Sequence, residues 1–409
     1  MKQKIFTVTY GGGHVNIIIP LLKELKNRED LELSTLGLSI AAESLKKAGI
    51  EHHTISHYKE LIMDEIAWKY GNSLAMKNHT EGKGISLEET VIYFGASMRD
   101  LIREKGQEEA LKIYADCGRA CFIPLYTMQL ILEQESPDML MTGNCPRMER
   151  AAMMVAKERG IKVLSLNDLL GFDKKYLFPA DKIAVISEIT RENLVKQGNP
   201  PGNIIITGSP AFDLILEEIR TFNKHYILDE IGLKTDSKVF LLATQPDKNC
   251  TWEMINMMVT ILDNYPEHYL VIKPHPGEDN RLYADYLSKL SHPRVVLTDI
   301  PVRKIIYVSE LTVTIYSTVG IESILMGVPL IQLNLMGIKN PIPLYEYGVS
   351  IEVKDYTELE KSVDKVLNDE KHKTEVEESR NHYFKYLLSG LGVKNCINLI
   401  NQLLNSRSF

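Results

Sequence analysis

Short apolar runs alternate with amphipathic stretches along almost the whole chain. Apolar runs that predict strands lie at residues 5–10, 139–142, 163–166, 182–186, 204–207, 239–243, 269–272, 295–297 and 311–315. Stretches with helical periodicity lie between them, at residues 17–26, 148–158, 188–197, 254–265 and 321–326. Strands and helices that alternate at this spacing predict parallel sheets covered by helices on both faces.

The alternation runs through the chain twice. We expect an α/β protein with two doubly wound, Rossmann-like domains that face a central cleft, at residues 1–215 and 216–380. Residues 57–135 depart from the alternation and predict a helical insertion in the first domain. Residues 381–409 predict a C-terminal helix that can pack back across either domain.

Composition and charge exclude several classes of protein. The 409 residues are 44% hydrophobic and 25% charged, values typical of globular domains. With 47 Lys and Arg against 54 Asp and Glu, the net charge of −7 gives no global attraction to nucleic acid. The most apolar region, 311–338, is broken by Glu322, Gly327 and Pro329, so we expect no membrane span and at most peripheral membrane association. Five scattered cysteines predict free thiols, and we expect a cytoplasmic protein.

The first candidate site is the sequence Tyr-Gly-Gly-Gly-His at residues 10–14, between a predicted strand and a predicted helix. Gly12 and Gly13 allow a ligand to approach the backbone closely, next to the unpaired N–H groups of a helix N-terminus. The run is no dinucleotide fingerprint, because the third glycine position falls on Asn16. A tight turn explains the glycines but not His14, which is therefore the candidate base or hydroxyl ligand.

The second candidate site lies around Lys273 and His275, just beyond a predicted strand. Prolines on both sides of the histidine stiffen the chain and fix His275 at the carboxyl end of the strand, where α/β sheets bind ligands. His-Pro pairs also occur in plain loops, but the neighbouring lysine favours a binding role. We interpret Glu278 as a solvated residue.

The third candidate site begins at Ser317 and Thr318, where a predicted strand meets a helix. The two hydroxyl groups and the N–H groups of Val319 and Gly320 form a donor cluster of phosphate size, supported by the helix dipole. Glu322, one turn on, can accept hydrogen bonds from ribose hydroxyls. The alternative is that the hydroxyl residues only cap the helix, and capping is compatible with binding.

Two amides complete the candidate set. Asn144 follows the strand at 139–142, and Gln245 follows the strand at 239–243. Because the carboxyl ends of parallel strands share one edge of a sheet, we expect Asn144 to face the cleft and Gln245 to contact a nucleotide.

Taken together, these stretches resemble the GT-B superfamily, which comprises nucleotide-sugar glycosyltransferases and the UDP-N-acetylglucosamine 2-epimerases. The stretches that carry the resemblance are 11–14, 160–163, 206–210, 273–276, 316–322 and 327–329. The resemblance implies a substrate activated by a nucleotide and a leaving phosphate that is neutralised without a metal ion or other cofactor.

Within that superfamily the epimerase motifs are incomplete. Epimerases carry an acidic residue where this chain has Asn144, and His-x-Glu-Ala-Gly where it has Ser-Leu-Asn-Asp-Leu at 165–169. Epimerisation needs such carboxylates for proton transfer. Asp168 lies one place out of register, so an epimerase or hydrolase stays open as the alternative.

The His-Pro and Ser-Thr pairs also resemble the donor-binding motifs of bacterial sialyl-, Kdo- and glycerophosphate-type transferases, whose donors are CMP- or CDP-linked. The main prediction is therefore a glycosyltransferase of surface-polysaccharide or glycoconjugate synthesis, which moves a sugar from a UDP-, CMP- or CDP-linked donor to a carbohydrate acceptor. His14 is the predicted base, and the nucleotide is predicted to bind the second domain. A relative that binds a nucleotide sugar without turnover is the remaining alternative.

Overall fold

The computed structural model describes residues 2–80, 84–144, 146–172, 177–246 and 248–406. The chain forms two compact units. One comprises Met1–Asp213 together with Ser389–Phe409, and the other comprises Leu214–Leu388. Among the described residues, no helix is long and apolar enough to cross a membrane.

The first unit is built on a sheet of six parallel strands in the order β2-β1-β3-β4-β5-β6. The strands are β1 (Gln3–Thr9), β2 (Leu31–Gly37), β3 (Met139–Thr142), β4 (Lys162–Asn167), β5 (Lys182–Val185) and β6 (Ile204–Ile206). The connecting helices are α1 (Gly13–Leu25), α2 (Ala41–Lys47), α8 (Arg147–Glu158) and α9 (Glu188–Lys196), and α10 (Pro210–Arg220) leads into the second unit. Phe6 and Val8 pack with α8 residues such as Met148 in one buried cluster, whereas α1 packs against β4 and the C-terminal helix.

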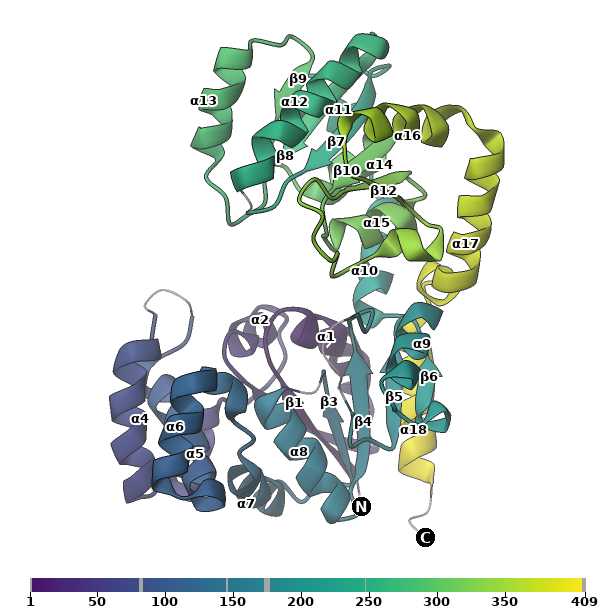
Figure 1. Ribbon diagram of the computed structural model, residues 1–409. Helices are drawn as coiled ribbons and strands as arrows, with labels where there is room; N and C mark the ends of the chain where they lie inside the picture. The colour runs from purple at the N-terminus through teal and green to yellow at the C-terminus, as the bar shows by residue number, and fades with distance from the viewer. Residues whose placement is uncertain (1, 81–83, 145, 173–176, 247, 407–409) are drawn as a thin grey trace. The chain divides into compact units, whose positions relative to one another are not determined.

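The segment between β2 and β3 is helical, as its sequence predicts, and carries a small core of its own. Its elements are η1 (Ile55–Tyr58), α3 (Lys59–Ile62), α4 (Glu65–Asn78), α5 (Leu87–Lys105), α6 (Gln107–Cys117), η2 (Gly118–Cys121) and α7 (Leu125–Glu135). Leu74, Phe94 and Phe122 fill the space between these helices, and Figure 1 shows α4, α5 and α6 grouped beside the sheet. Gly95 allows α5 to lie directly on α4, because a Cβ there would overlap the carbonyl oxygen of Ala67.

The second unit is built on another parallel sheet, in the order β12-β11-β10-β7-β8-β9. Its strands are β7 (Lys238–Ala243), β8 (His268–Lys273), β9 (Val295–Leu297), β10 (Leu311–Thr314), β11 (Leu330–Leu333) and β12 (Ile351–Val353). Its other elements are α11 (Lys224–Glu230), α12 (Lys248–Asn264), α13 (Asn280–Leu290), α14 (Val302–Val308), α15 (Val319–Met326), η4 (Leu344–Tyr347), α16 (Tyr356–Asn368) and α17 (Glu370–Leu388).

Successive residues of β7 enter different cores, which explains why this strand is apolar throughout. Phe240 and Leu242 pack with α12 and α16, while Val239 and Leu241 pack with α11 and α14. A central parallel strand is covered on both faces, so both sets of side chains are buried. The two six-stranded parallel sheets confirm the predicted fold class of two Rossmann-like domains.

The C-terminal segment differs from its prediction as one helix at 381–409. It contains two helices, α17, which ends at Leu388, and α18 (Gly392–Asn405). Gly390 between them has a φ of 63°, a conformation that ends a helix readily only at glycine. A Cβ at Gly392 would lie 2.5 Å from the backbone of Ser209, and Asp213 accepts hydrogen bonds from the N–H groups that open α18. These contacts fix α18 in the first unit and α17 in the second.

Candidate functional site

In each unit, the strand order reverses its direction of growth at one point. In the first unit that point lies between β1 and β3, which are direct neighbours with Val8 opposite Thr142. In the second unit it lies between β7 and β10. Connections from the two strands at such a point leave on opposite faces and open a crevice at the carboxyl ends, where α/β proteins bind ligands. Most of the predicted site residues follow these strands, while Lys273 and His275 lie at the end of β8, the next strand beyond β7.

In the first unit, His14 is held by a carboxylate that lies beneath it. Nδ1 of His14 lies 2.9 and 3.0 Å from the two carboxylate oxygens of Glu149, a residue of α8. Glu149 is fully buried, and the backbone N–H of Tyr10 donates to it as well. The His14 side chain is 20% exposed. The buried carboxylate thus orients an imidazole that still reaches solvent.

The surroundings of the pair set its protonation. Burial lowers the pKa of His14, but the hydrogen bond and charge of Glu149, with the charge of Asp168, outweigh it and raise the pKa above its usual value. Burial raises the pKa of Glu149. In the neutral imidazole, the Nδ1 proton donates to Glu149 and the lone pair lies on Nε2. Nε2 is therefore the basic nitrogen.

Asn144 and Asp168 complete this cluster. Nδ2 of Asn144 lies 3.3 Å from Nε2 of His14 and also donates to the Asp168 carboxylate. Oδ1 of Asn144 is buried and has no hydrogen-bond partner among the described residues. A Cβ at Gly13 would overlap Asp168, so only glycine leaves room for this carboxylate. Gly12, which caps α1, has a φ of 73°, where glycine is unstrained.

In the second unit, the loops after β7 and β10 are joined by Gln245. Its amide donates to the carbonyl of Tyr316 at 2.7 Å and accepts from the N–H of the same residue at 2.9 Å. Both ends of this side chain are used within the protein, so its role in the structure is to hold the two loops together. The prediction that it contacts a nucleotide remains a prediction.

The loop held by Gln245 leads into α15. Thr318 is exposed at the N-cap, and Oγ of Ser317 accepts from the N–H of Val319 at 3.3 Å. Gly320 is buried, and a Cβ there would press on Leu330. The hydroxyl pair therefore lies at a helix N-terminus, as predicted, while its role in binding stays a prediction.

The loop after β8 contains a hydrogen-bond centre that the sequence analysis interpreted differently. Glu278 accepts from the Thr244 hydroxyl at 2.6 Å, from the Tyr283 hydroxyl at 2.7 Å and from the N–H of His275 at 2.9 Å. It is therefore a structural residue that positions the His-Pro loop, and the expectation of a solvated side chain is wrong. Lys273 donates to the carbonyl of Asp299, and burial lowers its pKa.

Glu322 is engaged in an ion pair. Its carboxylate lies 3.1 Å from Nε of Arg303, whose Nη1 also contacts Glu218 at 2.6 Å. Burial raises the pKa of Glu322. A contact between Glu322 and ribose would therefore use a carboxylate that is already paired with Arg303. This contact remains a prediction.

Comparison with known proteins identifies the family of this chain. A family model described as UDP-N-acetylglucosamine 2-epimerase matches residues 180–386, just over half of the chain. The chain belongs to this family. No curated protein matches it in sequence.

Solved structures of the epimerase family share the fold over nearly the whole chain. The UDP-GlcNAc 2-epimerase of Neisseria meningitidis bound to UDP-GlcNAc is 14% identical, with a TM-score of 0.64, over 98% of this chain and 100% of that one. The S. aureus MnaA–UDP structure is 15% identical, with a TM-score of 0.61, over 100% and 98%. A glycosyltransferase of kitacinnamycin is 13% identical, with a TM-score of 0.59, over 98% and 99%. The family match favours the epimerase alternative over the main prediction of a transferase.

Because the chain belongs to the epimerase family, the position of Asp168 can be compared with that of the glutamate in the epimerase motif. In the sequence, Asp168 lies one residue out of register with the epimerase glutamate. In the structure β4 ends at Asn167, and Asp168 is the first residue beyond the strand, where its carboxylate meets Asn144. The one-residue shift thus leaves a carboxylate at the carboxyl edge of this family member.

A residue of the cluster that sequence reasoning missed is Glu149. The only signal for it in the sequence is an acidic residue on the apolar face of a helix, between Met148 and Ala152. Among the described residues, no three His, Cys, Asp or Glu side chains are arranged to hold a metal ion. Metal-independent chemistry remains a prediction.

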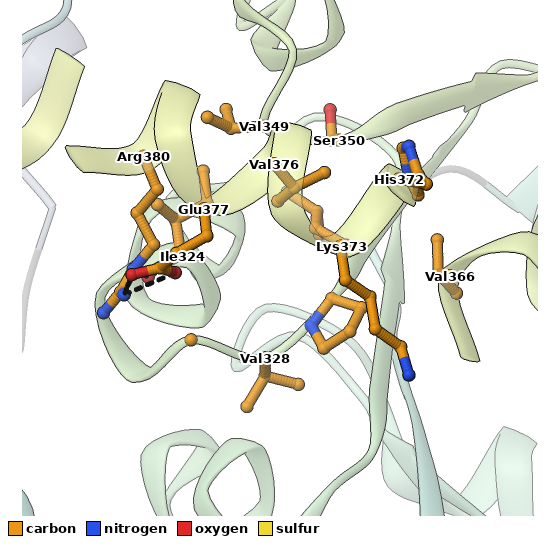
Figure 2. Close-up of a pocket in the computed structure, with 13 residues that line it drawn as sticks. Ile324, Val328, Val349, Ser350, Val366, His372, Lys373, Val376, Glu377 and Arg380 are labelled. Atoms are coloured by element: carbon orange, nitrogen blue, oxygen red, sulfur yellow. Dashed lines mark hydrogen bonds and ion pairs between the residues drawn. The ribbon is translucent and has the colours of Figure 1, made fainter. Parts of the chain in front are cut away.

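The second unit also contains an apolar cavity of about 310 Å³ (Figure 2). It lies where α15 ends and β11 begins, at the amino edge of the sheet and away from the loops of the candidate site. Its basic rim is already engaged: Arg380 donates to the carbonyls of Ile324 and Leu325 and pairs with Glu377. We assign this cavity no part in the reaction.

Proposed function

We propose that this protein acts on a UDP-linked N-acetylamino sugar, in the manner that the name of its family describes: it inverts carbon 2 or hydrolyses the same substrate. The observation that carries this proposal is the cluster of His14, Glu149 and Asp168 at the carboxyl edge of β1, β3 and β4. Family membership and the neighbours named for UDP-GlcNAc support the choice of substrate.

The chemistry of the substrate explains why such a cluster is needed. The C2–H bond of the sugar is not next to a carbonyl group, so its proton becomes acidic only while the C1–O bond to UDP breaks. A base takes the C2 proton, the C–H electrons form a C1=C2 double bond, and UDP leaves with the electrons of the C1–O bond. Return of a proton to the opposite face of C2, with UDP re-added at C1, gives the epimer, whereas water added at C1 gives hydrolysis.

The first unit offers two groups for these proton transfers. His14 is a base through Nε2, because Glu149 accepts the Nδ1 proton and stabilises the imidazolium that forms. Asp168 can carry a proton on the second face of the sugar. Two proton-transfer groups in one cluster suit an inversion, which removes a proton on one face and restores it on the other.

The nucleotide is assigned to the second unit. Ser317, Thr318 and the N–H groups that open α15 are donors for a phosphate, and Lys273 and His275 provide positive charge or donors at the end of β8, on the far side of β7. Stabilising the departing pyrophosphate in this way lowers the barrier to C1–O cleavage, which epimerisation and hydrolysis share.

The test is incubation of the protein with UDP-GlcNAc alone in D₂O, followed by NMR. We expect deuterium at C2, a second set of anomeric signals from the epimer, or release of UDP, and we expect His14→Asn to reduce all three by roughly 100-fold or more. His225→Asn, at an exposed histidine of the second unit, is the matched control. UDP-GlcNAc that persists unchanged with the unmodified protein would refute the proposal.

A glycosyltransferase is the second candidate, and the presence of Asn144 in place of the epimerase acid favours it. A transferase needs one base, for the acceptor hydroxyl, and the His14–Glu149 pair supplies one. Turnover of the nucleotide sugar that appears only after a carbohydrate acceptor is added would select this candidate.

A further inference from the structure

A small pocket in the first unit lies where the helical insertion meets the carboxyl edge of the sheet. Its volume is about 90 Å³, enough for a carboxylate or phosphate group but not for a nucleotide. Tyr10 and Arg147 line it from the sheet side, and Tyr93 and Arg119 line it from the insertion. None of these four residues belongs to the catalytic cluster described above.

Arg147 has a strained backbone conformation and, within the described part of the chain, an unpaired side-chain donor. It is the first residue of α8 and has a φ of 45°, in the left-handed region that residues other than glycine rarely adopt. Its guanidinium lies over the ring of Tyr10, 4.4 Å from the ring centre. Nε of Arg147 is buried without a hydrogen-bond partner among the described residues. Strained backbone conformations cluster at ligand-binding and active sites, and an unsatisfied buried donor is a group to which a ligand can bind.

Other polar groups of the pocket can donate hydrogen bonds. The hydroxyls of Tyr10 and Tyr93 lie 3.3 Å apart, and burial raises the pKa of both, so they stay neutral and can donate. Arg119 is exposed, and its guanidinium forms no hydrogen bond or ion pair with the described part of the chain. The acidic lining residue is Glu89, whose carboxylate is used by Ser86 in the capping box of α5. The described lining of the pocket thus has two positively charged guanidinium groups and one carboxylate, which already accepts hydrogen bonds from Ser86.

The pocket and the catalytic cluster share Tyr10 as a neighbour. Arg147 lies over the face of the Tyr10 ring, and the ring centre of His14 lies 6.3 Å from that of Tyr10, with the two ring planes at 84°. A group bound beside Arg147 and Arg119 is therefore separated from His14 by the width of one side chain.

We propose that this pocket binds an anionic group, a carboxylate or a phosphate, on the molecule that His14 acts on. The inference rests on the proposed function, and it deepens it: the natural substrate carries a negative charge beyond its pyrophosphate, either on the nucleotide-linked sugar or on a second sugar substrate. The planar fork of each guanidinium suits such groups, and the neutral tyrosine hydroxyls add uncharged donors.

The test measures binding to the full chain by calorimetry with five probes: UDP, UDP-glucose, UDP-glucuronic acid, N-acetylglucosamine and N-acetylglucosamine 6-phosphate. We expect one of the two sugars with an added anionic group to gain at least about 10-fold in affinity over its neutral counterpart, UDP-glucose or N-acetylglucosamine. Arg119→Gln is expected to remove that gain while the affinity for UDP stays the same. Arg103→Gln is the matched control, because Arg103 stacks on Tyr126 in the same insertion and does not line the pocket.

The outcomes separate the two proposals. A gain with UDP-glucuronic acid places the charge on the nucleotide-linked sugar, and a gain with the sugar phosphate places it on a second substrate. No gain with either probe overturns the pocket proposal, as does an Arg119→Gln variant that loses UDP affinity instead, since the pyrophosphate would then lie here. These readings come from binding, so they stand apart from the turnover of UDP-GlcNAc that tests the proposed function. Because Arg119 is exposed, its substitution leaves the core intact.

Discussion

Replacing Glu149 by glutamine removes the charge below His14 and keeps the shape of the side chain. The amide oxygen of glutamine can still accept the Nδ1 proton, so the imidazole keeps its orientation. What changes is the stability of the imidazolium, because the carboxylate that lies 2.9 Å from Nδ1 no longer offsets its charge. The expected result is a fall in the pKa of His14.

The size of the fall follows from the geometry. Charge centres about 4 Å apart, at an effective dielectric constant near 20, interact by about 4 kcal/mol. At about 1.36 kcal/mol for each pKa unit, this sets a ceiling of about 3 units. The His14 side chain is 20% exposed, so solvent screens part of the interaction. We expect a fall of about 1–2 units.

Two assays measure this change. NMR titration of the His14 ring reports the pKa directly, and the pH profile of kcat/KM for UDP-GlcNAc should show its acidic limb moved to lower pH, because the base must be neutral to act. Glu133→Gln, at a surface ion pair with Arg159, is the control. A titration midpoint for His14 that does not move in Glu149→Gln would refute the reasoning.

The same substitution also predicts a change in stability with pH. Both His14 and Glu149 have folded-state pKa values raised above those of the unfolded chain, so the folded state holds more protons. Their contribution to stability is fully present below the unfolded pKa values, about 4.3 for glutamate and about 6.5 for histidine, and is lost as pH rises through the folded values. Glu149→Gln should flatten this dependence in denaturant unfolding measured between pH 4 and pH 8, about the range that contains both groups.

Three further variants test other parts of the structure. Ser317→Ala combined with Thr318→Ala should weaken UDP binding by about 1–3 kcal/mol in calorimetry, the range for hydrogen bonds to charged groups. Arg380→Met removes two donors from the carbonyls that end α15 and should lower the free energy of unfolding of the second unit by about 1–3 kcal/mol in urea. Gly13→Ala should displace the Asp168 side chain and abolish most turnover, with a nearly unchanged thermal midpoint, because the added methyl meets the flexible end of that side chain.

Each of these variants has a matched control. Thr374→Ala removes an exposed hydroxyl from α17, Arg281→Met removes an exposed guanidinium, and Gly202→Ala adds a methyl where no atom lies within 4 Å. Unchanged UDP affinity in the double variant, an unchanged unfolding midpoint in Arg380→Met, or full turnover in Gly13→Ala would contradict the corresponding assignment.

The fold was predictable where burial on both faces gives a strand a clear apolar run. β7 is apolar from Val239 to Ala243, and Ile5, Phe6 and Val8 form the apolar part of β1. β2 escapes the pattern, because Glu32, Ser34 and Thr35 interrupt its apolar residues, although it pairs with β1 over its whole length. β11 and β12 are short strands that were not predicted either. Tertiary pairing rather than local pattern defines these three strands.

Only those site residues that directly follow a predicted strand could be predicted from the sequence. His14 and Asn144 follow neighbouring strands, so the topology brings them to one edge, and the structure places them 3.3 Å apart. Glu149 could not be recognised, because an acidic residue in a helix is usually solvated and only the packing of α8 buries it. The meeting of Asp168 with Asn144 depends on the path of the chain beyond β4, which no motif encodes.

The motifs of the second unit cannot by themselves separate an epimerase from a transferase. Both reactions break the bond between C1 and a nucleotide phosphate, so the proposed donors Ser317 and Thr318 would serve either reaction. The reactions differ in what happens at the sugar once that bond has weakened: a transferase needs one base for an acceptor hydroxyl, and an epimerase needs proton transfer on both faces of C2. The decisive groups must therefore lie in the first unit, where the His14–Glu149 pair alone fits either reaction. We propose Asp168 as the second proton-transfer group, so a loss of C2 exchange in Asp168→Asn with retained UDP release would assign the inversion to it.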